Sequence, residues 1–313
     1  MFLRDCTRMR HIVYLINPIS GTGGKKSLKT LISRLTEEQR IHYSIVDTHP
    51  TGDYHFLREK IKMEFVTDVV VAAGDGTVRQ VAKALQGIPT QVSLGIIPRG
   101  SGNGLAFAAG IPKDPRRALE IIFANRYALV DAFYVNEQFC CMLSGLGFDA
   151  QVAHDFARSG TRGLPTYIKT AFRNFFHAPT YPFEVYLNGQ QFNTEAYFIS
   201  IANSNQFGNH FTIAPEASLG DGMLDIVIVQ QMSKWRLVHS VLRQIRSGKV
   251  QRRYGISDST KNILYFQAKS LTIRNPRLAP LHIDGDPWPG NDTFTIQVIP
   301  KAFRLLQPLS LPL

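Results

Sequence analysis

The fold is decided by one stretch of the sequence, Val69-Val70-Val71-Ala72-Ala73-Gly74-Asp75-Gly76-Thr77-Val78. Its first five residues are apolar and favour β-structure, which is typical of a strand buried on both faces in a parallel sheet. From Val78 to Leu85 apolar residues recur at helical spacing, and Asp75 or Thr77 can cap that helix. The stretch therefore predicts a strand, a tight turn and a helix.

The turn inside this stretch has the chemistry of a binding loop. Gly74 and Gly76 permit backbone angles that other residues avoid, so the chain can reverse sharply. Free backbone amides and the helix dipole make the start of the helix favourable for phosphate. Asp75 places a carboxylate where an anion is expected, which indicates a metal ion or a proton to be moved. The alternative is an ordinary turn, because Gly-Asp-Gly turns are common between strands and helices.

Two more glycine-rich loops follow predicted strands in the first half of the chain. The strand His11–Ile16 leads into a loop at residues 17–26, and a strand at residues 92–98 leads into a loop at residues 99–106. The loop at residues 17–26 resembles a Walker phosphate loop but does not have its spacing, and neither this loop nor the turn at Gly74 has the dinucleotide fingerprint. With a further strand at residues 43–48, these elements predict a parallel sheet whose carboxyl edge collects the loops, and open α/β sheets bind ligands at that edge.

The second half of the chain has a different pattern of predicted secondary structure. After a helix at Pro115–Ala124, short strands separated by turns predict an antiparallel β domain with helical insertions at residues 165–176 and 234–247. We expect two domains, residues 1–130 and 131–300, with the tail at about 300–313 able to pack back on the first. The expected strands cover residues 128–135, 138–145, 183–187, 196–202, 223–229, 271–274, 281–283 and 293–298.

Composition narrows the class of protein. The 313 residues include no apolar run near the roughly 20 residues that a membrane-spanning helix needs. The first residues lack the apolar core of a signal peptide, so we expect a cytoplasmic protein. Cys6, Cys140 and Cys141 show no metal-ligand spacing and fit a reducing compartment, where they act as packing residues.

The net charge of +11 indicates an anionic partner, which could be a nucleotide, a nucleic acid or an acidic membrane surface. No basic segment alternates with stacking aromatics as in nucleic-acid-binding proteins, so we expect no nucleic acid. Two stretches at residues 158–176 and 234–253 combine basic and aromatic side chains, which suits peripheral contact with the inner face of a membrane. A solvated helix face explains them equally well. Nothing in the sequence decides the oligomeric state.

In this order, the motifs resemble those of the diacylglycerol kinase and sphingosine kinase superfamily, lipid kinases related to NAD kinase and phosphofructokinase. The resemblance implies an N-terminal parallel-sheet nucleotide-binding domain and a C-terminal antiparallel β-sandwich domain. It departs from the family where Ala73 replaces a glycine, where Asp286 replaces a glutamate, and where Asn209-His210 replaces a glycine pair. The matching motifs are Asn17-Pro18 with Ser20-Gly21, Gly74-Asp75-Gly76-Thr77, residues 98–103, Ile213-Ala214-Pro215, residues 221–225 and Ile283-Asp284-Gly285.

By resemblance, the reaction is transfer of the ATP γ-phosphoryl group to a lipid hydroxyl with the help of Mg²⁺. The resemblance makes Asp75, Asp284 and Asp286 the catalytic acids, with Asp286 as the base and Asp75 as its rival. Thr48 would contact the adenosine side of the nucleotide; the alternative is an ordinary residue at the end of a strand. The nucleotide-binding residues implied are Asn17, Ser20, Gly21, Thr48, Gly74, Asp75, Gly76, Thr77, Gly100, Ser101 and Asn103.

The resemblance also implies a structural Mg²⁺ held by Asp221 with backbone oxygens of Ser218 and Met223, since hard cations prefer oxygen ligands. A turn acid in a hairpin is the alternative. Asp149 resembles the residue with which sphingosine kinases hold the polar head of the lipid, although a structural acid would also fit. The loop from Gly100 favours a sphingoid long-chain base such as sphinganine, with diacylglycerol second.

Two other readings of the chain stay open. A soluble-metabolite kinase of the NAD kinase type shares the Gly-Asp-Gly-Thr motif, but the order of the later motifs argues against this class of enzyme. A non-catalytic member of the family that binds lipid or nucleotide is suggested only by Ala73 and Asp286. Both residues are still compatible with catalysis, because Ala73 is small and Asp286 keeps the acid.

Overall fold

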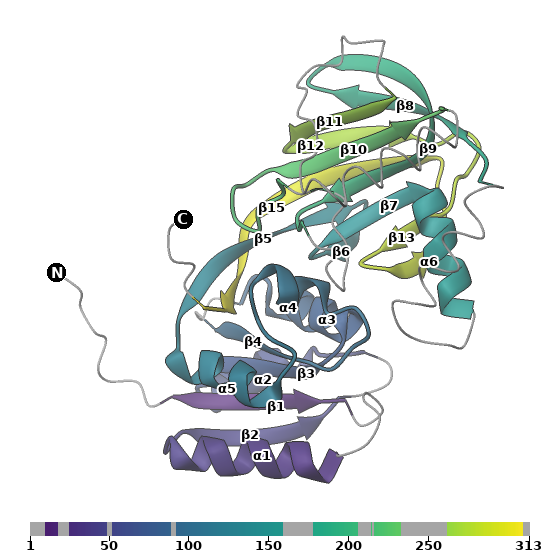
Figure 1. Cartoon of the computed structure of the whole chain (residues 1–313). Coiled ribbons are helices and arrows are strands. Elements are labelled where there is room, and N and C mark those ends of the chain that lie inside the picture. Colours follow the sequence, from purple (N-terminus) through teal and green to yellow (C-terminus); the bar gives the residue numbers. More distant parts are fainter. Residues whose placement is uncertain are drawn as a thin grey trace. The chain divides into compact units, whose positions relative to one another are not determined.

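The computed structural model describes residues 10–17, 25–48, 52–88, 92–158, 178–205, 214, 216–232 and 262–308. The chain divides into two compact units (Figure 1). Unit 1 takes its described residues from 10–130 and 302–308, and unit 2 takes its own from 131–301. The division falls within two strands, since both β5 (Tyr127–Val135) and β15 (Thr293–Leu306) contribute residues to each unit.

Unit 1 is built on a parallel sheet of four strands in the order β4-β3-β1-β2. Every residue of β1 (His11–Ile16), β3 (Asp68–Ala73) and β4 (Ser93–Pro98) is buried, whereas β2 (His42–Asp47) lies at the edge and is partly exposed. Their uninterrupted apolar sequences thus reflect burial on both faces, as predicted. The end of β15 extends the sheet, with Leu305 opposite Leu94 in a parallel pair.

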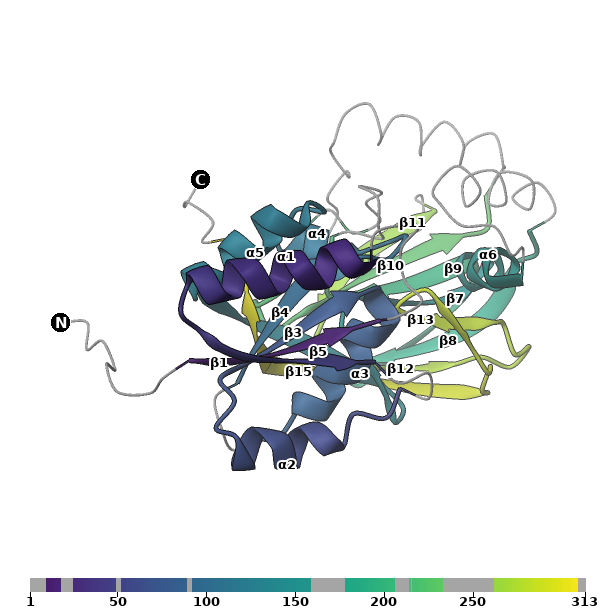
Figure 2. The same cartoon turned by 90° about the horizontal axis from the view of Figure 1, so that it is seen from below.

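Helices cover both faces of this sheet. On one face α1 (Lys25–Glu38) packs with α5 (Pro115–Ala124), and on the other α2 (Phe56–Met63) packs with α3 (Asp75–Leu85) (Figure 2). A short helix, α4 (Gly104–Ala108), follows β4. The two-sided cover is the expected consequence of joining parallel strands by helical crossovers.

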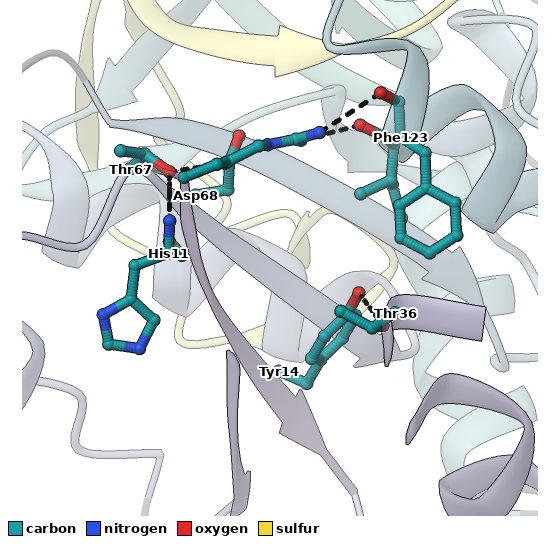
Figure 3. Close-up of polar contacts among 8 residues, drawn as sticks. His11, Tyr14, Thr36, Thr67, Asp68 and Phe123 are labelled. Atoms are coloured by element: carbon teal, nitrogen blue, oxygen red, sulfur yellow. Dashed lines mark hydrogen bonds and ion pairs between the residues drawn. The ribbon is translucent and has the colours of Figure 1, made fainter. Parts of the chain in front are cut away.

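A polar network holds the amino end of the sheet together (Figure 3). Arg10 donates from Nε to Oδ2 of Asp68 at 2.7 Å, and its terminal nitrogens donate to the carbonyls of Ile122 and Phe123 at the end of α5. The Thr67 hydroxyl donates to the same carboxylate oxygen at 2.7 Å and accepts a hydrogen bond from the amide of His11 at 3.0 Å. One buried ion pair therefore links β1, β3 and α5.

Unit 2 consists of antiparallel strands that enclose an apolar core, with one described helix. Phe133, Phe183, Ile199, Ile226 and Phe294 lie in this core and come from five different strands. The remaining elements are β6 (Gln138–Cys140), β7 (Leu143–Gly147), α6 (Phe148–Arg158), β8 (Tyr181–Leu187), β9 (Gln190–Ala202), β10 (Leu224–Gln230), β11 (Ile263–Ala268), β12 (Ser270–Arg274), β13 (Leu281–Ile283) and β14 (Asp286–Trp288).

These elements confirm the predicted fold class, a parallel-sheet unit followed by an antiparallel β-sandwich-like unit, and the bounds of β1, α5 and β13 match to the residue. The prediction was wrong at residues 138–145, where β6 and β7 replace one strand. The carboxylate of Asp284 accepts hydrogen bonds from the amides of residues 141–143, and the chain leaves the sheet ladder at residues 141 and 142. The prediction missed α6, β11 and β14, and the two predicted helical insertions lie outside the described residues.

None of the helices in the described ranges has both the length and the apolar character needed to cross a bilayer.

Removing the charge of Asp68 should destabilise unit 1. Asp68→Asn would leave the guanidinium of Arg10, which is 15% exposed, without its counter-ion, and we expect the free energy of unfolding to fall by about 2–4 kcal/mol. The matched control is Asp47→Asn, which breaks an ion pair of 2.8 Å with Lys29 between half-exposed side chains and should cost below about 1 kcal/mol. Denaturant unfolding of both variants measures the difference; equal losses would contradict the role of the network.

Tyr14 should make stability fall at alkaline pH. Burial raises the pKa of its phenol from 10.0 to about 12, against the lowering effect of its hydrogen bond with Thr36. Because the pKa is higher in the folded state, this contribution to stability is complete below pH 10 and is lost as the pH rises towards 12. Tyr14→Phe should therefore lose less stability than the wild type between pH 9 and pH 11 in chemical unfolding; parallel pH profiles would refute the assignment.

Candidate functional site

The loops after β3 and β4 meet at the carboxyl edge of the unit 1 sheet, as predicted, whereas residues 18–24 of the loop after β1 lie outside the described residues. The residues that follow the strands are in register: the amide of Asn17 donates to Ala72, that of Thr48 to Ile16, and that of Arg99 to Ala73, at 2.9 to 3.3 Å. The strand order changes direction between β1 and β3, because β2 lies beyond β1 and β4 lies beyond β3. In open α/β sheets such a switch point is the usual place for a ligand.

The loops after β3 and β4 touch through their backbones. A Cβ atom added to Gly100 would lie 2.7 Å from Cα of Gly74, and one added to Gly74 would lie 3.2 Å from Cα of Gly100. A Cβ on Gly102 would lie 2.9 Å from Oδ2 of Asp75. At Gly100 the approach to the backbone of Gly74 is closer than a Cβ atom permits, and the structure brings Gly74, Asp75 and Gly100 together.

The N-terminus of α3 lies at this contact. The helix starts at Asp75 and its N-cap is Gly74, in an extended conformation and without a side-chain hydrogen bond to the helix. The prediction that Asp75 or Thr77 caps the helix was wrong, because both lie inside its first turn. A helix start without a side-chain cap presents backbone amides and the positive end of the dipole, which suits a phosphate group.

Tyr54 joins two of the predicted nucleotide residues. Its phenol lies near the side chains of Thr48, which follows β2, and Thr77, in the first turn of α3, and both side chains lower its pKa. The tyrosine is 3% exposed and burial raises the pKa of its phenol. Sequence reasoning did not single out Tyr54, because one aromatic residue in a loop carries no motif.

Asn103 shapes the second loop. It adopts left-handed angles with φ 55°, its Oδ1 accepts from the amide of Gly100 at 2.7 Å, and its Nδ2 donates to the carbonyl of Gly100 at 2.8 Å. The side chain was predicted as a nucleotide contact, but it is 3% exposed and both ends of its amide bond to the loop. Its contribution is therefore to close the turn at residues 100–103.

Arg99, which precedes this turn, was not among the predicted site residues. Its Nε atom is buried and has no hydrogen-bond partner among the described residues. A guanidinium group at the carboxyl edge of the sheet has the charge and the donor geometry to bind a phosphate. Together with the glycine contact and the α3 terminus, it makes the described residues fit the phosphates of a nucleotide.

The acids predicted in unit 2 have different environments. Asp284 is 7% exposed, and its carboxylate accepts hydrogen bonds from Sγ of Cys140 and from the amides of Cys141, Met142 and Leu143, at 2.9 to 3.1 Å. Predicted as catalytic, this carboxylate is instead occupied in fixing the connection between β6 and β7. Asp286, two residues further on, is exposed at the start of β14.

Asp149, predicted to hold the lipid head group, lies in the first turn of α6 and is 6% exposed. Its Oδ2 atom is 3.1 Å from Nε2 of His282 in β13. The structure therefore places Asp149 in a buried pair, and His282 is a polar residue that sequence reasoning missed, because a lone histidine in a strand carries no motif.

The loop predicted to hold a structural Mg²⁺ is a tight turn. Asp221 is exposed, and its Oδ1 accepts from the amide of Met223 at 3.0 Å, while Ser218 is exposed nearby in the chain. Burial raises the pKa of Asp225, whose carboxylate accepts hydrogen bonds from Tyr265 and Gln267. Within the described ranges no three His, Cys, Asp or Glu side chains gather as metal ligands, so these residues do not build a side-chain metal centre.

Several predicted residues lie outside the described part of the chain. They are Cys6, Pro18, Ser20 and Gly21, Ile213 and Pro215, the pair Asn209-His210, and the basic stretch at residues 234–253 together with most of that at residues 158–176.

The fold and the site define a nucleotide-dependent phosphotransferase, with glycine loops and a helix N-terminus at the carboxyl edge of a parallel sheet. A model of the diacylglycerol kinase catalytic domain matches residues 11–135, and one of the YegS C-terminal NAD kinase beta sandwich-like domain matches residues 143–307. The chain belongs to this family of lipid kinases and is an enzyme; kinases of this kind use ATP.

Similar proteins agree with this assignment. The chain is 26% identical to a probable lipid kinase YegS-like of Shewanella frigidimarina, over 97% of this chain and 96% of the relative. It is 27% identical to the probable lipid kinase YegS of Salmonella dublin, over 91% and 93%. A solved structure of a diacylglycerol kinase from Bacillus anthracis has a TM-score of 0.71 at 18% identity, over 97% and 98%, which shows a shared fold.

Loss of the Tyr54 hydroxyl should weaken nucleotide binding. Tyr54→Phe removes the hydroxyl that lies near the side chains of Thr48 and Thr77, and with it the hydrogen bonds that we expect it to form with them. A lost hydrogen bond of about 1 kcal/mol corresponds to an increase of about fivefold in the KM for ATP. The control is Tyr43→Phe, which removes an exposed hydroxyl bonded to Glu37 and should leave the KM unchanged. An unchanged KM in Tyr54→Phe, measured in steady-state kinetics, would contradict the placement.

Proposed function

We propose that this enzyme transfers the γ-phosphoryl group of ATP to the hydroxyl of a membrane lipid, a sphingoid long-chain base such as sphinganine before diacylglycerol. The observation that carries the proposal is the backbone contact of Gly74 with Gly100 beside the N-terminus of α3. It supplies amides, a helix dipole and the Asp75 carboxylate at one place. The relatives named probable lipid kinases support a lipid as acceptor.

The residues of unit 1 would act on the nucleotide. The amides at the start of α3 and around Gly100 bind the phosphates, with Gly76 and Ser101 in the same two segments and Asn17 directly after β1, and the guanidinium of Arg99 adds charge. Asp75 is the carboxylate that would hold Mg²⁺, and the ion would neutralise charge that develops on the phosphates. Tyr54, near both Thr48 and Thr77, would help to position these two side chains. Positioning is the main requirement, because the transition state of phosphoryl transfer is loose.

Unit 2 would supply the acid-base chemistry and the acceptor site. We assign the role of general base to Asp286, an exposed carboxylate, with Asp75 as the rival. Asp284 acts on the shape of the turn and not on the substrate, because its oxygens are occupied by four donors. A structural Mg²⁺ near Asp221 would depend on backbone oxygens such as those of Ser218 and Met223.

The proposed place of action is the cytoplasmic face of a membrane, to which the enzyme attaches peripherally. The net charge of +11 supports attraction to anionic headgroups. A lipid kinase has to collect its substrate from a bilayer, and the basic charge offers a way to do so without a spanning segment.

The test is transfer of radiolabelled γ-phosphate from Mg-ATP to mixed micelles that contain sphinganine, ceramide or diacylglycerol. We expect labelled sphinganine phosphate, and a decrease of at least about 100-fold in kcat for Asp75→Asn, because a group that stabilises charge in the transition state is lost. Asp286→Asn should lower kcat similarly, and the exposed Asp292→Asn is its matched control with full activity.

Each other outcome has a defined meaning. Label in phosphatidic acid would keep the family and change the acceptor to diacylglycerol. Label in NAD, tested in parallel without lipid, would replace the proposal with an NAD-kinase-like activity. Binding of ATP without transfer to any acceptor would identify a non-catalytic member.

A further inference from the structure

We propose that the buried pair Asp149–His282 is a positioning device that holds the turn at residues 284–286, and with it the carboxylate of Asp286, in a productive orientation. The inference rests on the proposed function, in which Asp286 acts on the acceptor hydroxyl. It replaces the expectation that Asp149 contacts the lipid head group directly.

The two nitrogens of His282 have different partners. The side chain is fully buried, with Nε2 3.1 Å from Oδ2 of Asp149 and Nδ1 3.2 Å from the backbone nitrogen of Gly285. Since an amide can only donate, Nδ1 must be the acceptor, and the proton of the neutral ring is then on Nε2, where it is donated to the carboxylate. Asp149 therefore selects the one neutral tautomer that can hold the amide of Gly285.

The neighbouring strand leaves room for this pair. Gly145 in β7 is opposite His282 in the antiparallel ladder. A Cβ atom at residue 145 would lie 2.6 Å from Nε2 of His282 and would also collide with Oδ2 of Asp149. The pair is thus built into the sheet at a position that only glycine can oppose.

The turn held by His282 joins β13 to β14 and is fixed from two sides. Asp284 and Gly285 both have left-handed angles, with φ of 49° and 84°, between the paired residues Ile283 and Asp286. Asp-Gly with these angles is typical of a two-residue hairpin turn. The carboxylate of Asp284 holds one side of the turn against residues 140–143, and His282 holds the amide of Gly285 on the other.

Helix α6 connects the Asp149–His282 pair to the rest of unit 2. Besides Asp149, it contributes His154, whose Nε2 lies 2.8 Å from the carbonyl oxygen of Leu281, next to His282. The helix therefore contacts β13 at two successive residues. An error of about 1 Å in the position of a catalytic group can lower the rate about 100-fold. A turn that holds Asp286 rigidly therefore favours a high rate.

A pair of substitutions separates the two contacts of His282. In His282→Asn the side-chain oxygen replaces Nδ1 and can accept from Gly285, but the contact with Asp149 is lost. In His282→Gln the amide nitrogen replaces Nε2 and can donate to Asp149, but the acceptor for Gly285 is lost. Both substitutions remove the ring, so a role in packing alone would affect both variants equally.

We expect His282→Gln to lower kcat with sphinganine at least about 10-fold, and His282→Asn to lower it less than about threefold, both with an ATP KM close to that of the wild type. Protection of the Gly285 amide in hydrogen exchange should follow the same order. Equal losses of kcat in the two variants, or full activity in His282→Gln, would overturn the inference.

Nitrogen NMR shifts of the His282 ring supply a readout that does not need activity. They should report the tautomer with the proton on Nε2, and the opposite tautomer would overturn the inference even in an active enzyme. A wild-type protein that phosphorylates no acceptor would overturn the proposed function and the catalytic part of the inference, while the exchange and tautomer measurements would still decide the hydrogen bond between His282 and Gly285.

Discussion

The backbone contact between Gly74 and Gly100 is the constraint on which the nucleotide site depends. Two parallel strands in register, β3 and β4, end at Ala73 and Pro98, which face each other in the ladder. The chain must then turn twice within a few ångströms, and any side chain at Gly100 would collide with the backbone of Gly74. The contact sets where α3 begins, and so determines where its amides and Asp75 are presented.

Elsewhere in the molecule, buried carboxylates fix the positions of neighbouring segments. Asp68 joins β1, β3 and α5 through Arg10, Asp284 gathers the amides between β6 and β7, and Asp149 orients His282. Asp131, which is fully buried, accepts from the amides of Gly222 and Lys301 at 2.6 Å. A buried carboxylate is stable only when donors or a counter-ion compensate for its lost hydration, and each of these has them.

This pattern separates the acids by role. The carboxylates that we assign to chemistry, Asp75 and Asp286, are partly or fully exposed, and the nearly buried ones accept hydrogen bonds from groups of the protein. A metal ion or a hydroxyl group can reach an exposed carboxylate from solvent. On this criterion we propose that Asp284 and Asp149 act on the protein and not on the substrate.

The sequence by itself determined the elements with strong local signals. Uninterrupted apolar runs predicted β1, β3 and β4, and the glycine loops after them predicted a binding edge, because strand burial and tight turns depend on nearby residues. Only the tertiary structure decided the division of β6 from β7, the closure of the second loop by Asn103, and the partners of Tyr54, Asp149 and His282. These features join residues up to 144 positions apart, as in the bond between Cys140 and Asp284. Such contacts leave no local pattern, because their energy arises only when folding removes water from both partners.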